Sequence, residues 1–331
     1  MEMVKHFTTT DLHSAGEPLR VITAGIPFIM GNTMLEKHVY FHDHFDYVKN
    51  ILLSEPRGHL GMKGCIITPP IDEESEFGVL FINHDEDYIL CSHSIIAVIT
   101  YMLETGMVQL NEYKQVIIDT PSGKVVTKPV FKESQVIEVS LDLIPAYVYK
   151  NNIAIRSHGI DLMIDLGFSN DSFYVMINAA ELGLKVEIDQ LPELKKWTQI
   201  IMKEIEELNL IQEENQIIKG TIFSNSPENS DSNLRYVTIF GNGQIDRSPY
   251  GAGVGVQLAQ LHQKGKLGIG ERIILESIIG ARANCSISLD HNKLTKSKFI
   301  VPHICGRAFI TGMHQFVVDP SDPLFEGFLL K

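Results

Sequence analysis

The chain has 331 residues, 44% of them apolar, so it is long enough for two domains and holds ample material for packed cores. Its formal net charge of −13 repels phosphate backbones and anionic lipid surfaces, which argues against a nucleic acid or a membrane as partner. The first residues lack the apolar core of a signal peptide, and no apolar run is long enough to cross a bilayer. We therefore expect a soluble cytoplasmic protein.

Short segments rich in β-branched and aromatic residues, bounded by Gly, Pro or Asp, occur along the whole chain. Such segments predict β-strands. They lie at residues 19–29, 65–70, 77–83, 115–120, 124–131, 135–144, 173–180, 236–243, 272–280, 299–305 and 308–318. Because they do not alternate regularly with helices, a doubly wound parallel sheet is not expected.

Three segments predict helices. Residues 94–105 and about 251–264 are largely apolar, and each is followed by a glycine, Gly106 or Gly265, which suits the left-handed end of a helix. Residues 193–210 carry apolar side chains at helical spacing among many charges, which predicts an amphipathic surface helix. The first helix is apolar on nearly every side, so we expect it to be buried with a sheet around it.

The two apolar helices follow similar segments of chain. The strand at 77–83 leads through a turn to Cys91 and the first helix, and the strand at 236–243 leads through a turn to Tyr250 and the second. This repeated order of strand, turn and buried helix indicates two similar halves with a cleft between them.

The cysteines are widely spaced and form no Cys-x-x-Cys pair, which argues against a disulfide framework and against structural zinc. Free thiols are most often small buried apolar groups, and we interpret Cys65, Cys285 and Cys305 in this way. Cys91 differs because it directly precedes a helix. Unpaired N–H groups and the positive end of the helix dipole lower the pKa of a thiol there, and they also bind a carboxylate.

Several long motifs occur in one order along the chain. They are DLHSAGEPLRVITAGIP at 11–27, EPRGH at 55–59, CSH at 91–93, FGNGQIDRSP at 240–249 and DPSDPLFEGFLL at 319–330. With these motifs, nearly the whole chain resembles the proline racemase family, which includes proline racemases, hydroxyproline 2-epimerases and trans-3-hydroxyproline dehydratases. The resemblance implies an enzyme that needs no cofactor and no metal.

The resemblance also implies an α/β (α+β) fold like that of diaminopimelate epimerase, with two halves that are each a mostly antiparallel sheet closed around a central helix. We expect residues 1–122 plus 303–331 to form the half that carries Cys91. Residues 123–302 would then form the half that carries Tyr250, with the active site in the cleft between the two. A homodimer is an expectation from the resemblance.

By resemblance, the substrate carboxylate would meet the backbone N–H groups of four residues, and two side chains would contact its nitrogen. The four are Ser92, His93, Gly251 and Ala252, and the two side chains are those of His93 and Asp246. Cys91 would remove the α-proton, because carboxylate binding at a helix start stabilises the negative charge that develops at Cα.

Tyr250 stands where the racemases carry their second catalytic cysteine. A racemase without cofactor needs two acid–base groups on opposite faces of Cα, and a phenol with a pKa of about 10 is a poor base but a possible acid. Three alternatives follow. In the first, Tyr250 is the second acid–base group of a racemase or epimerase. In the second, Cys91 is the single base of a 3-hydroxyproline dehydratase, as in family dehydratases that replace the second cysteine with threonine. In the third, Tyr250 blocks the site, and the chain is an imino-acid-binding protein.

Five further residues depart from the family pattern. Ser92 replaces a glycine and Ala252 a threonine, both beside the expected carboxylate site, while Gly61 replaces an aspartate and Ser169-Asn170 a Gly-Gly pair. The backbone N–H donors survive these changes, so a carboxylate ligand is still expected.

Other motifs have plainer interpretations. His42, Asp43 and His44 could suggest a metal site, but they alternate or lie in a loop and no second ligand pair stands out. The segment 55–59 reads as a structural turn, and 241–243 reads as a hairpin turn and not as a phosphate loop. The sequence therefore predicts α-proton chemistry on proline or a hydroxyproline, with racemisation or 2-epimerisation (an isomerase) first and dehydration (a hydro-lyase) second.

Overall fold

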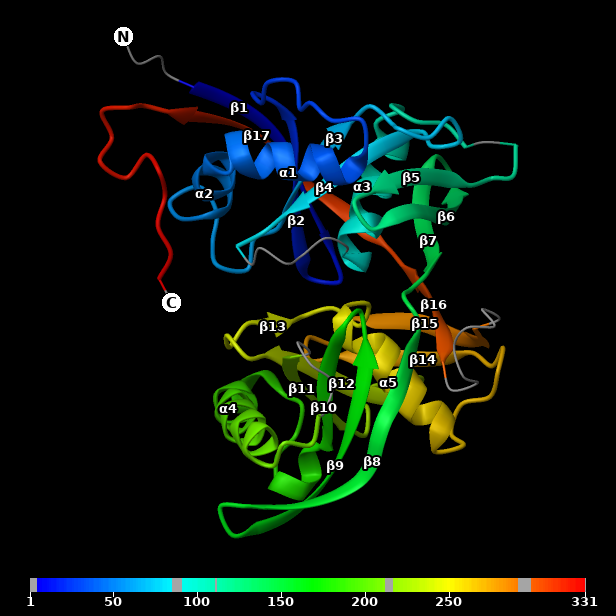
Figure 1. Ribbon diagram of the computed structural model, residues 1–331. Coiled ribbons are helices and arrows are strands. Elements are labelled where there is room, and N and C mark those ends of the chain that lie inside the picture. Colours follow the sequence, from blue (N-terminus) through cyan, green and yellow to red (C-terminus); the bar gives the residue numbers. More distant parts are fainter. Residues whose placement is uncertain (1–4, 85–90, 111, 212–216, 291–298, 331) are drawn as a thin grey trace. The chain divides into compact units, whose positions relative to one another are not determined.

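The computed structural model describes residues 5–84, 91–110, 112–211, 217–290 and 299–330, and the chain divides into two compact units. Unit 1 comprises Met1–Leu141 and Gly306–Lys331, and unit 2 comprises Asp142–Cys305 (Figure 1). The first boundary lies near residue 141 and not near 122, because the strand at 123–132 pairs with the strand at 116–120, and the strand at 135–142 pairs with that strand in turn, so both extend the sheet of unit 1. The second boundary, where the chain passes from unit 2 back to unit 1, follows Cys305, three residues later than expected.

The described residues of unit 1 form one mostly antiparallel sheet and three helices. Its strands are β1 (Lys5–Ser14), β2 (Glu17–Ala24), β3 (Gly64–Thr68), β4 (Phe77–Ile82), β5 (Val116–Thr120), β6 (Gly123–Lys132), β7 (Gln135–Asp142) and β17 (Ala308–Val318). Its helices are α1 (Met34–Phe45), α2 (Tyr47–Leu53) and α3 (Ser92–Glu104). The strands pair in the order β17-β1-β2-β3-β4-β5-β6-β7, with parallel pairs at β2–β3 and β4–β5.

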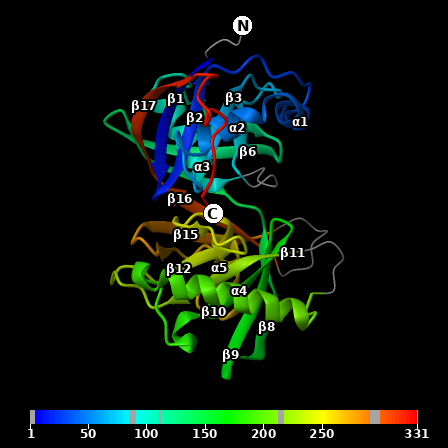
Figure 2. The ribbon, with the colours of Figure 1, turned by 90° about the vertical axis from the view of Figure 1, so that its left-hand side faces the viewer.

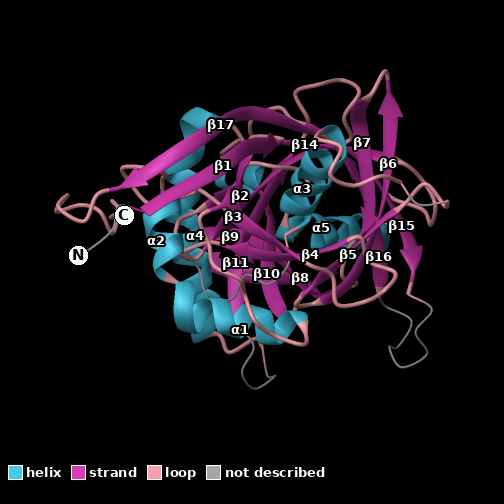
Figure 3. Ribbon diagram, turned by 90° about the horizontal axis from the view of Figure 1, so that it is seen from above, coloured by secondary structure: helices cyan, strands magenta, loops and turns pink. Residues whose placement is uncertain are grey.

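Helix α3 is the buried helix of unit 1. Every side chain from His93 to Leu103 is buried, and the helix packs against β1, β2 and β17 (Figure 3). This confirms the expectation for residues 94–105, although the helix begins two residues earlier. It ends as predicted, because Gly106 follows with a φ of 73°, in the left-handed region that glycine adopts without strain.

Unit 2 contains a sheet that closes on itself. Its strands are β8 (Ala146–Ser157), β9 (Ile160–Ser169), β10 (Ser172–Asn178), β11 (Ile217–Asn225), β12 (Leu234–Phe240), β13 (Ile245–Asp246), β14 (Ile273–Ser277), β15 (Arg282–Leu289) and β16 (Ile300–Gly306). Pairing runs β8-β9-β10-β11-β12-β14-β15-β16, and Ile300 of β16 pairs with Ala146 of β8 to complete the ring. The expected mostly antiparallel sheet around a helix is therefore present here.

Two longer helices belong to unit 2, together with the short turns η1 (Ala179–Leu182) and η2 (Ile188–Gln190). Helix α5 (Ala252–Gln263) packs against β8, β9, β10 and β12 and ends before Gly265, whose φ is 67°. Helix α4 (Leu191–Glu207) crosses the outside of the strands (Figure 2) and buries Leu194, Thr198, Ile201 and Ile205 at helical spacing. The prediction of an amphipathic helix is confirmed, with a start two residues earlier.

The short motifs of unit 1 have structural roles. The EPRGH segment is a turn in which Gly58 N donates to Ser54 O, and the Arg57 side chain donates to the carbonyls of Ile51 and Phe325. His42 and His44 lie on helix α1, so the expectation that they alternate or lie in a loop was wrong. Their ring nitrogens contact Asp46 and the carbonyl of Tyr40.

The predicted hairpin at 241–243 is also present. It joins β12 to β13, with Phe240 N donating to Gln244 O at 2.9 Å and with Gly243 at a φ of 80°. Within the described ranges, no helix has the length and apolar character that a membrane crossing requires.

Candidate functional site

Cys91 lies at the N-cap of helix α3. Its carbonyl accepts the hydrogen bond of Ile95 N at 2.9 Å, so helical hydrogen bonding starts at this residue. The first N–H groups of a helix have no partners within it and point out of its end, where the dipole is positive. The thiol predicted to be catalytic therefore stands at a helix start, in a potential that favours a thiolate.

Two side chains from the first turn of α3 contact the Cys91 sulfur. His93 Nε2 lies 2.8 Å from Sγ, and the Ser94 hydroxyl donates to Sγ at 3.1 Å. The Cys91 and His93 side chains are almost fully buried, at 2% and 1% exposed. A basic nitrogen and a hydroxyl donor are thus held against one sulfur, an arrangement that can take a proton from a thiol and stabilise the anion.

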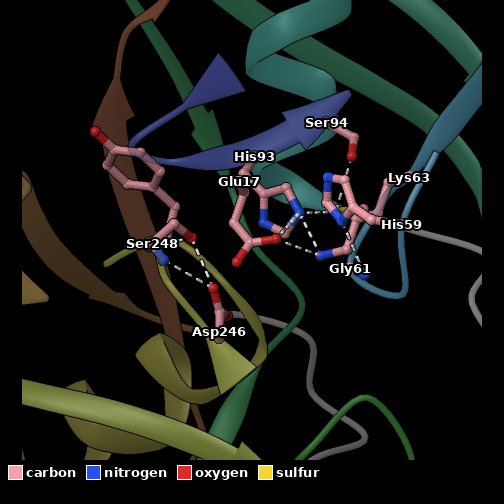
Figure 4. Close-up of polar contacts among 10 residues, drawn as sticks. Glu17, His59, Gly61, Lys63, His93, Ser94, Asp246 and Ser248 are labelled. Atoms are coloured by element: carbon pink, nitrogen blue, oxygen red, sulfur yellow. Dashed lines mark hydrogen bonds and ion pairs between the residues drawn. The ribbon is translucent and has the colours of Figure 1, made fainter. Parts of the chain in front are cut away.

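Two charged side chains from neighbouring strands extend this cluster (Figure 4). Lys63, just before β3, places Nζ 2.7 Å from His93 Nε2 and 3.1 Å from Glu17 Oε2. Glu17 begins β2 and is 1% exposed. The two strands are aligned at this point because Arg20 N donates to Lys63 O at 2.8 Å. We call Glu17, Lys63, Cys91, His93 and Ser94 the thiol network.

Charge balance explains why the thiol network holds together. A buried carboxylate is costly unless it is paired, and the Lys63 ammonium supplies the pair for Glu17. His93 Nε2 contacts both Cys91 Sγ and Lys63 Nζ, and one ring nitrogen holds at most one proton. A change in the protonation of any one of these three groups therefore changes the proton positions of the other two.

The start of helix α5 in unit 2 is built differently. Asp246 of β13 is buried, and its Oδ1 accepts hydrogen bonds from Ser248 N at 3.0 Å and from Ser248 Oγ at 2.9 Å (Figure 4). Gly251 is the N-cap of the helix. A Cβ on Gly251 would stand 1.4 Å from Asp246 Oδ2, so the glycine lets the carboxylate lie against the backbone at the helix start.

Tyr250 precedes this helix and is 4% exposed. Its hydroxyl donates to the carbonyl of Arg282 on β15 at 3.3 Å, and its N–H lies 3.4 Å from Ser248 Oγ. Burial, and then the negative charge of Asp246, raises the pKa of the nearby Tyr174 and Tyr236. The Asp246 carboxylate therefore makes ionisation of these two phenols still less favourable.

The residues predicted for the site fall into two groups, each within one unit. Cys91, Ser92 and His93 lie together at the start of α3, and Asp246, Tyr250 and Gly251 lie together at the start of α5. Ala252 is the first residue of α5. Five residues in contact with these groups were not predicted from the sequence: Glu17, Lys63, Ser94, Ser248 and Arg282.

The other cysteines and the histidine-rich segment were also assigned from the sequence. Cys65 and Cys285 are buried free thiols, and burial raises the pKa of each. Cys305 is only partly buried, so the expectation of a fully buried thiol was wrong for this residue. In the part of the chain that the structure describes, no cluster of three His, Cys, Asp or Glu side chains is arranged to hold a metal ion.

Comparison with known proteins assigns the class. The family model described as proline racemase matches residues 9–329. A trans-3-hydroxy-L-proline dehydratase of Bacillus cereus is 42% identical, with 100% of each chain covered. A proline racemase of Acetoanaerobium sticklandii is 36% identical, with 99% of each chain covered. The crystal structure of a hydroxyproline epimerase from Agrobacterium vitis with bound trans-4-hydroxy-L-proline has a TM-score of 0.80 at 25% identity, covering 98% of this chain and 95% of that one.

These similarities, together with the two helix starts, define an enzyme of isomerase or hydro-lyase type. The chain belongs to the proline racemase family. The expected fold class is confirmed as well, since the mixed α/β architecture rich in strands also matches a PhzF-family protein of Bacillus anthracis with a TM-score of 0.66.

Proposed function

We propose that this chain catalyses the dehydration of trans-3-hydroxy-L-proline, with Cys91 as the base that removes the α-proton. The single observation that carries the proposal is the contrast between Cys91 and Tyr250. The Cys91 sulfur contacts a histidine and a serine hydroxyl, whereas the Tyr250 hydroxyl donates to the backbone carbonyl of Arg282. One helix start therefore offers a base, and the other offers a phenol that is already hydrogen-bonded.

The chemistry of the two reactions explains why this contrast matters. Racemisation needs a group that removes a proton from one face of Cα and a second group that delivers a proton to the other face. Dehydration needs a base at Cα and an acid for the leaving hydroxyl, and no inversion takes place. A protein with one activated thiol is therefore better suited to elimination than to inversion.

Relatives and substrate recognition support the same proposal. The relative from Bacillus cereus, a trans-3-hydroxy-L-proline dehydratase, aligns along the whole chain at 42% identity. In the proposal, the N–H groups of Ser92 and His93 at the start of α3, and those of Gly251 and Ala252 at the start of α5, bind the carboxylate. The side chains of His93 and Asp246 bind the ring nitrogen, whose positive charge a carboxylate stabilises.

Racemisation or 2-epimerisation is the second candidate function. It is favoured by the 36% identity to a proline racemase and by the structural match to a hydroxyproline epimerase. For this reaction the Tyr250 phenol has to leave the Arg282 carbonyl and deliver a proton to Cα. Because a phenol has a pKa of about 10, the reverse reaction, in which it removes a proton, would be the slower direction.

An incubation of the protein in heavy water, followed by NMR, tests the proposal. The substrates are trans-3-hydroxy-L-proline, trans-4-hydroxy-L-proline and L-proline, each in a separate sample. We expect loss of the hydroxyl from the first, with an imine that borohydride reduces to proline, and no inversion of the other two. Inversion with deuterium at Cα and no loss of water would establish the second candidate, and no reaction with any substrate would indicate a binding protein.

A further inference from the structure

The stereochemistry of trans-3-hydroxy-L-proline places a demand on the enzyme. In the trans isomer the hydroxyl and the carboxylate lie on opposite faces of the ring, so the α-hydrogen lies on the same face as the hydroxyl. A direct elimination therefore removes a proton and a hydroxide from one face. The base at Cα and the acid at the hydroxyl have to approach from the same side, and hydroxide is a poor leaving group unless it is protonated as it departs.

Resting on the proposed function, we propose that Lys63 is the acid that protonates the leaving hydroxyl, and that His93 returns the proton from Cys91 to Lys63. Lys63 Nζ lies 2.7 Å from His93 Nε2, and the same nitrogen lies 2.8 Å from Cys91 Sγ. The ammonium and the thiol are thus on the two sides of one imidazole nitrogen. Both belong to unit 1 and lie within hydrogen-bond distance of the same nitrogen, and in the proposal they face the same side of the substrate ring.

The other members of the thiol network are less suited to this role. The Ser94 hydroxyl already donates to Cys91 Sγ, and Glu17 is the carboxylate that accepts from Lys63. Among the five side chains of the network, Lys63 is the most exposed, at 18% compared with 1% for Glu17 and His93. Its ammonium can therefore reach a ligand while Glu17 keeps it charged.

The step balances with these groups alone. The Cys91 thiolate takes the α-proton, and the electron pair of the Cα–H bond becomes the Cα=Cβ double bond. The electron pair of the C–O bond leaves with the hydroxyl group, which takes a proton from the Lys63 ammonium and departs as water. The organic product is the cyclic enamine, which becomes the imine by taking a proton at Cβ and losing one from nitrogen. The protein is left with a thiol at Cys91 and a neutral amine at Lys63.

His93 can reset the site without an outside proton. The Cys91 thiol gives its proton to His93 Nε2, and the same nitrogen gives it to the neutral Lys63 Nζ, because both partners are within hydrogen-bond distance. This restores the thiolate and the ammonium for the next substrate. The positive helix start favours the thiolate, and the Glu17 carboxylate favours the ammonium.

A leaving group that needs no acid separates this role from a structural one. The variant Lys63→Met is compared with the wild-type protein on trans-3-hydroxy-L-proline and on the 3-fluoro analogue of the same configuration, which loses fluoride without protonation. We expect water loss to fall by about 10²- to 10⁴-fold, the usual contribution of general acid catalysis, and fluoride release to fall at least about tenfold less than water loss, because the only effect on it is the lost charge beside Glu17. Lys63→Arg keeps the charge beside Glu17 but is too weak an acid, so it should behave in the same way.

Equal losses of water and fluoride release in both variants would overturn the proposal, because Lys63 would then only support the thiol. Unchanged water loss in either variant would overturn it as well. The matched control is Lys124→Met, which removes a lysine of unit 1 that pairs with Asp72 and Glu74 at the surface and should leave both rates unchanged. If the wild-type protein releases fluoride but no water, the proposed function fails, which is a different result from failure of the Lys63 variants.

Discussion

The starts of helices α3 and α5 occupy matching places in the two units but carry different chemistry. At α3, a thiol, an imidazole, an ammonium and a carboxylate are connected by contacts of 2.7–3.1 Å. At α5, the Asp246 carboxylate is held by Ser248, and the Tyr250 hydroxyl donates to a backbone carbonyl. Two similar frameworks therefore carry different side chains, which in the proposed function perform proton transfer in unit 1 and substrate binding in unit 2.

This difference shows how one family can contain both isomerases and hydro-lyases. The helix start supplies N–H donors through the backbone, and these survive any side-chain replacement. Proton transfer depends on side chains, so replacing one of them changes the reaction while the framework for the carboxylate remains. The changes below test whether the two helix starts differ in the way described.

The largest effect is expected from Cys91→Ser. A serine hydroxyl is a far weaker acid than a thiol and does not form the anion at neutral pH, so α-proton removal should fall by about 10³- to 10⁴-fold, or about 4–5.5 kcal/mol. The measurement is the rate of water loss, together with deuterium exchange at Cα. The matched control is Cys65→Ala, a buried free thiol of the same unit, which should keep most of the activity. Retained exchange in Cys91→Ser would place the base elsewhere.

Gly251→Ala should destabilise unit 2 because the new methyl group would meet Asp246 Oδ2 at 1.4 Å. The carboxylate has to move and lose its hydrogen bonds to Ser248, at an expected cost of about 2–4 kcal/mol in the free energy of unfolding. Urea unfolding measures this free energy. Gly268→Ala is the control, because the nearest atom to a Cβ at that position belongs to the flexible end of the Glu271 side chain. Equal stability of the two variants would show that the fixed position of Asp246 is not essential.

Glu17→Gln tests whether the thiol network depends on its buried charge. The change removes the partner that keeps Lys63 protonated, and hydrogen bonds to charged groups contribute about 1.5–3 kcal/mol, so turnover should fall by about 10- to 100-fold. The pH profile of turnover is recorded along with the rate. A loss of turnover that varies with pH indicates a changed protonation state in the thiol network, whereas a loss that is the same at every pH indicates a lost structural contact. Glu74→Gln, which removes an exposed partner of Lys124, is the control and should have no effect.

Tyr250→Phe should have the smallest effect. The hydroxyl donates to the Arg282 carbonyl, and losing this hydrogen bond should cost about 0.5–1.5 kcal/mol of stability. Water loss from the substrate should stay within about threefold of the wild-type rate, because the phenol takes no part in the proposed reaction. A fall of a hundredfold or more would instead make Tyr250 the second acid–base group and favour racemisation.

The positions of the two helix starts were predictable from the sequence because the signals are local. Cys91 and Tyr250 each precede an apolar segment that ends at a glycine, and the family motifs surround both. The same local signals placed most strands correctly. Six strands were not predicted: β1, β8, β9, β11, β13 and β15. For β8 and β9, the pairing is irregular near Lys150 and Asn152 has a φ of 53°, so polar and apolar residues do not alternate cleanly there.

The members of the thiol network outside α3 were not predictable in the same way. Lys63 is thirty residues from His93 in sequence, and Glu17 is seventy-six. The pairing of β2 with β3 brings Glu17 and Lys63 together, and the packing of α3 against β2 adds His93. A lysine in a loop before a strand is normally a solvated surface group. Glu17 lies inside the family motif at 11–27, but that motif does not indicate that Glu17 pairs with Lys63.

The β1–β17 pairing has a consequence for the order in which the protein can fold. Unit 1 is assembled from both ends of the chain, because β17, residues 308–318, hydrogen-bonds along β1. Unit 2 is one continuous stretch of chain, and Leu143 N donates to Pro302 O at 2.8 Å near its two ends. During synthesis unit 2 can thus complete its ring of strands before β17 has been made, and the sheet that packs against α3 is completed last, when β17 pairs with β1.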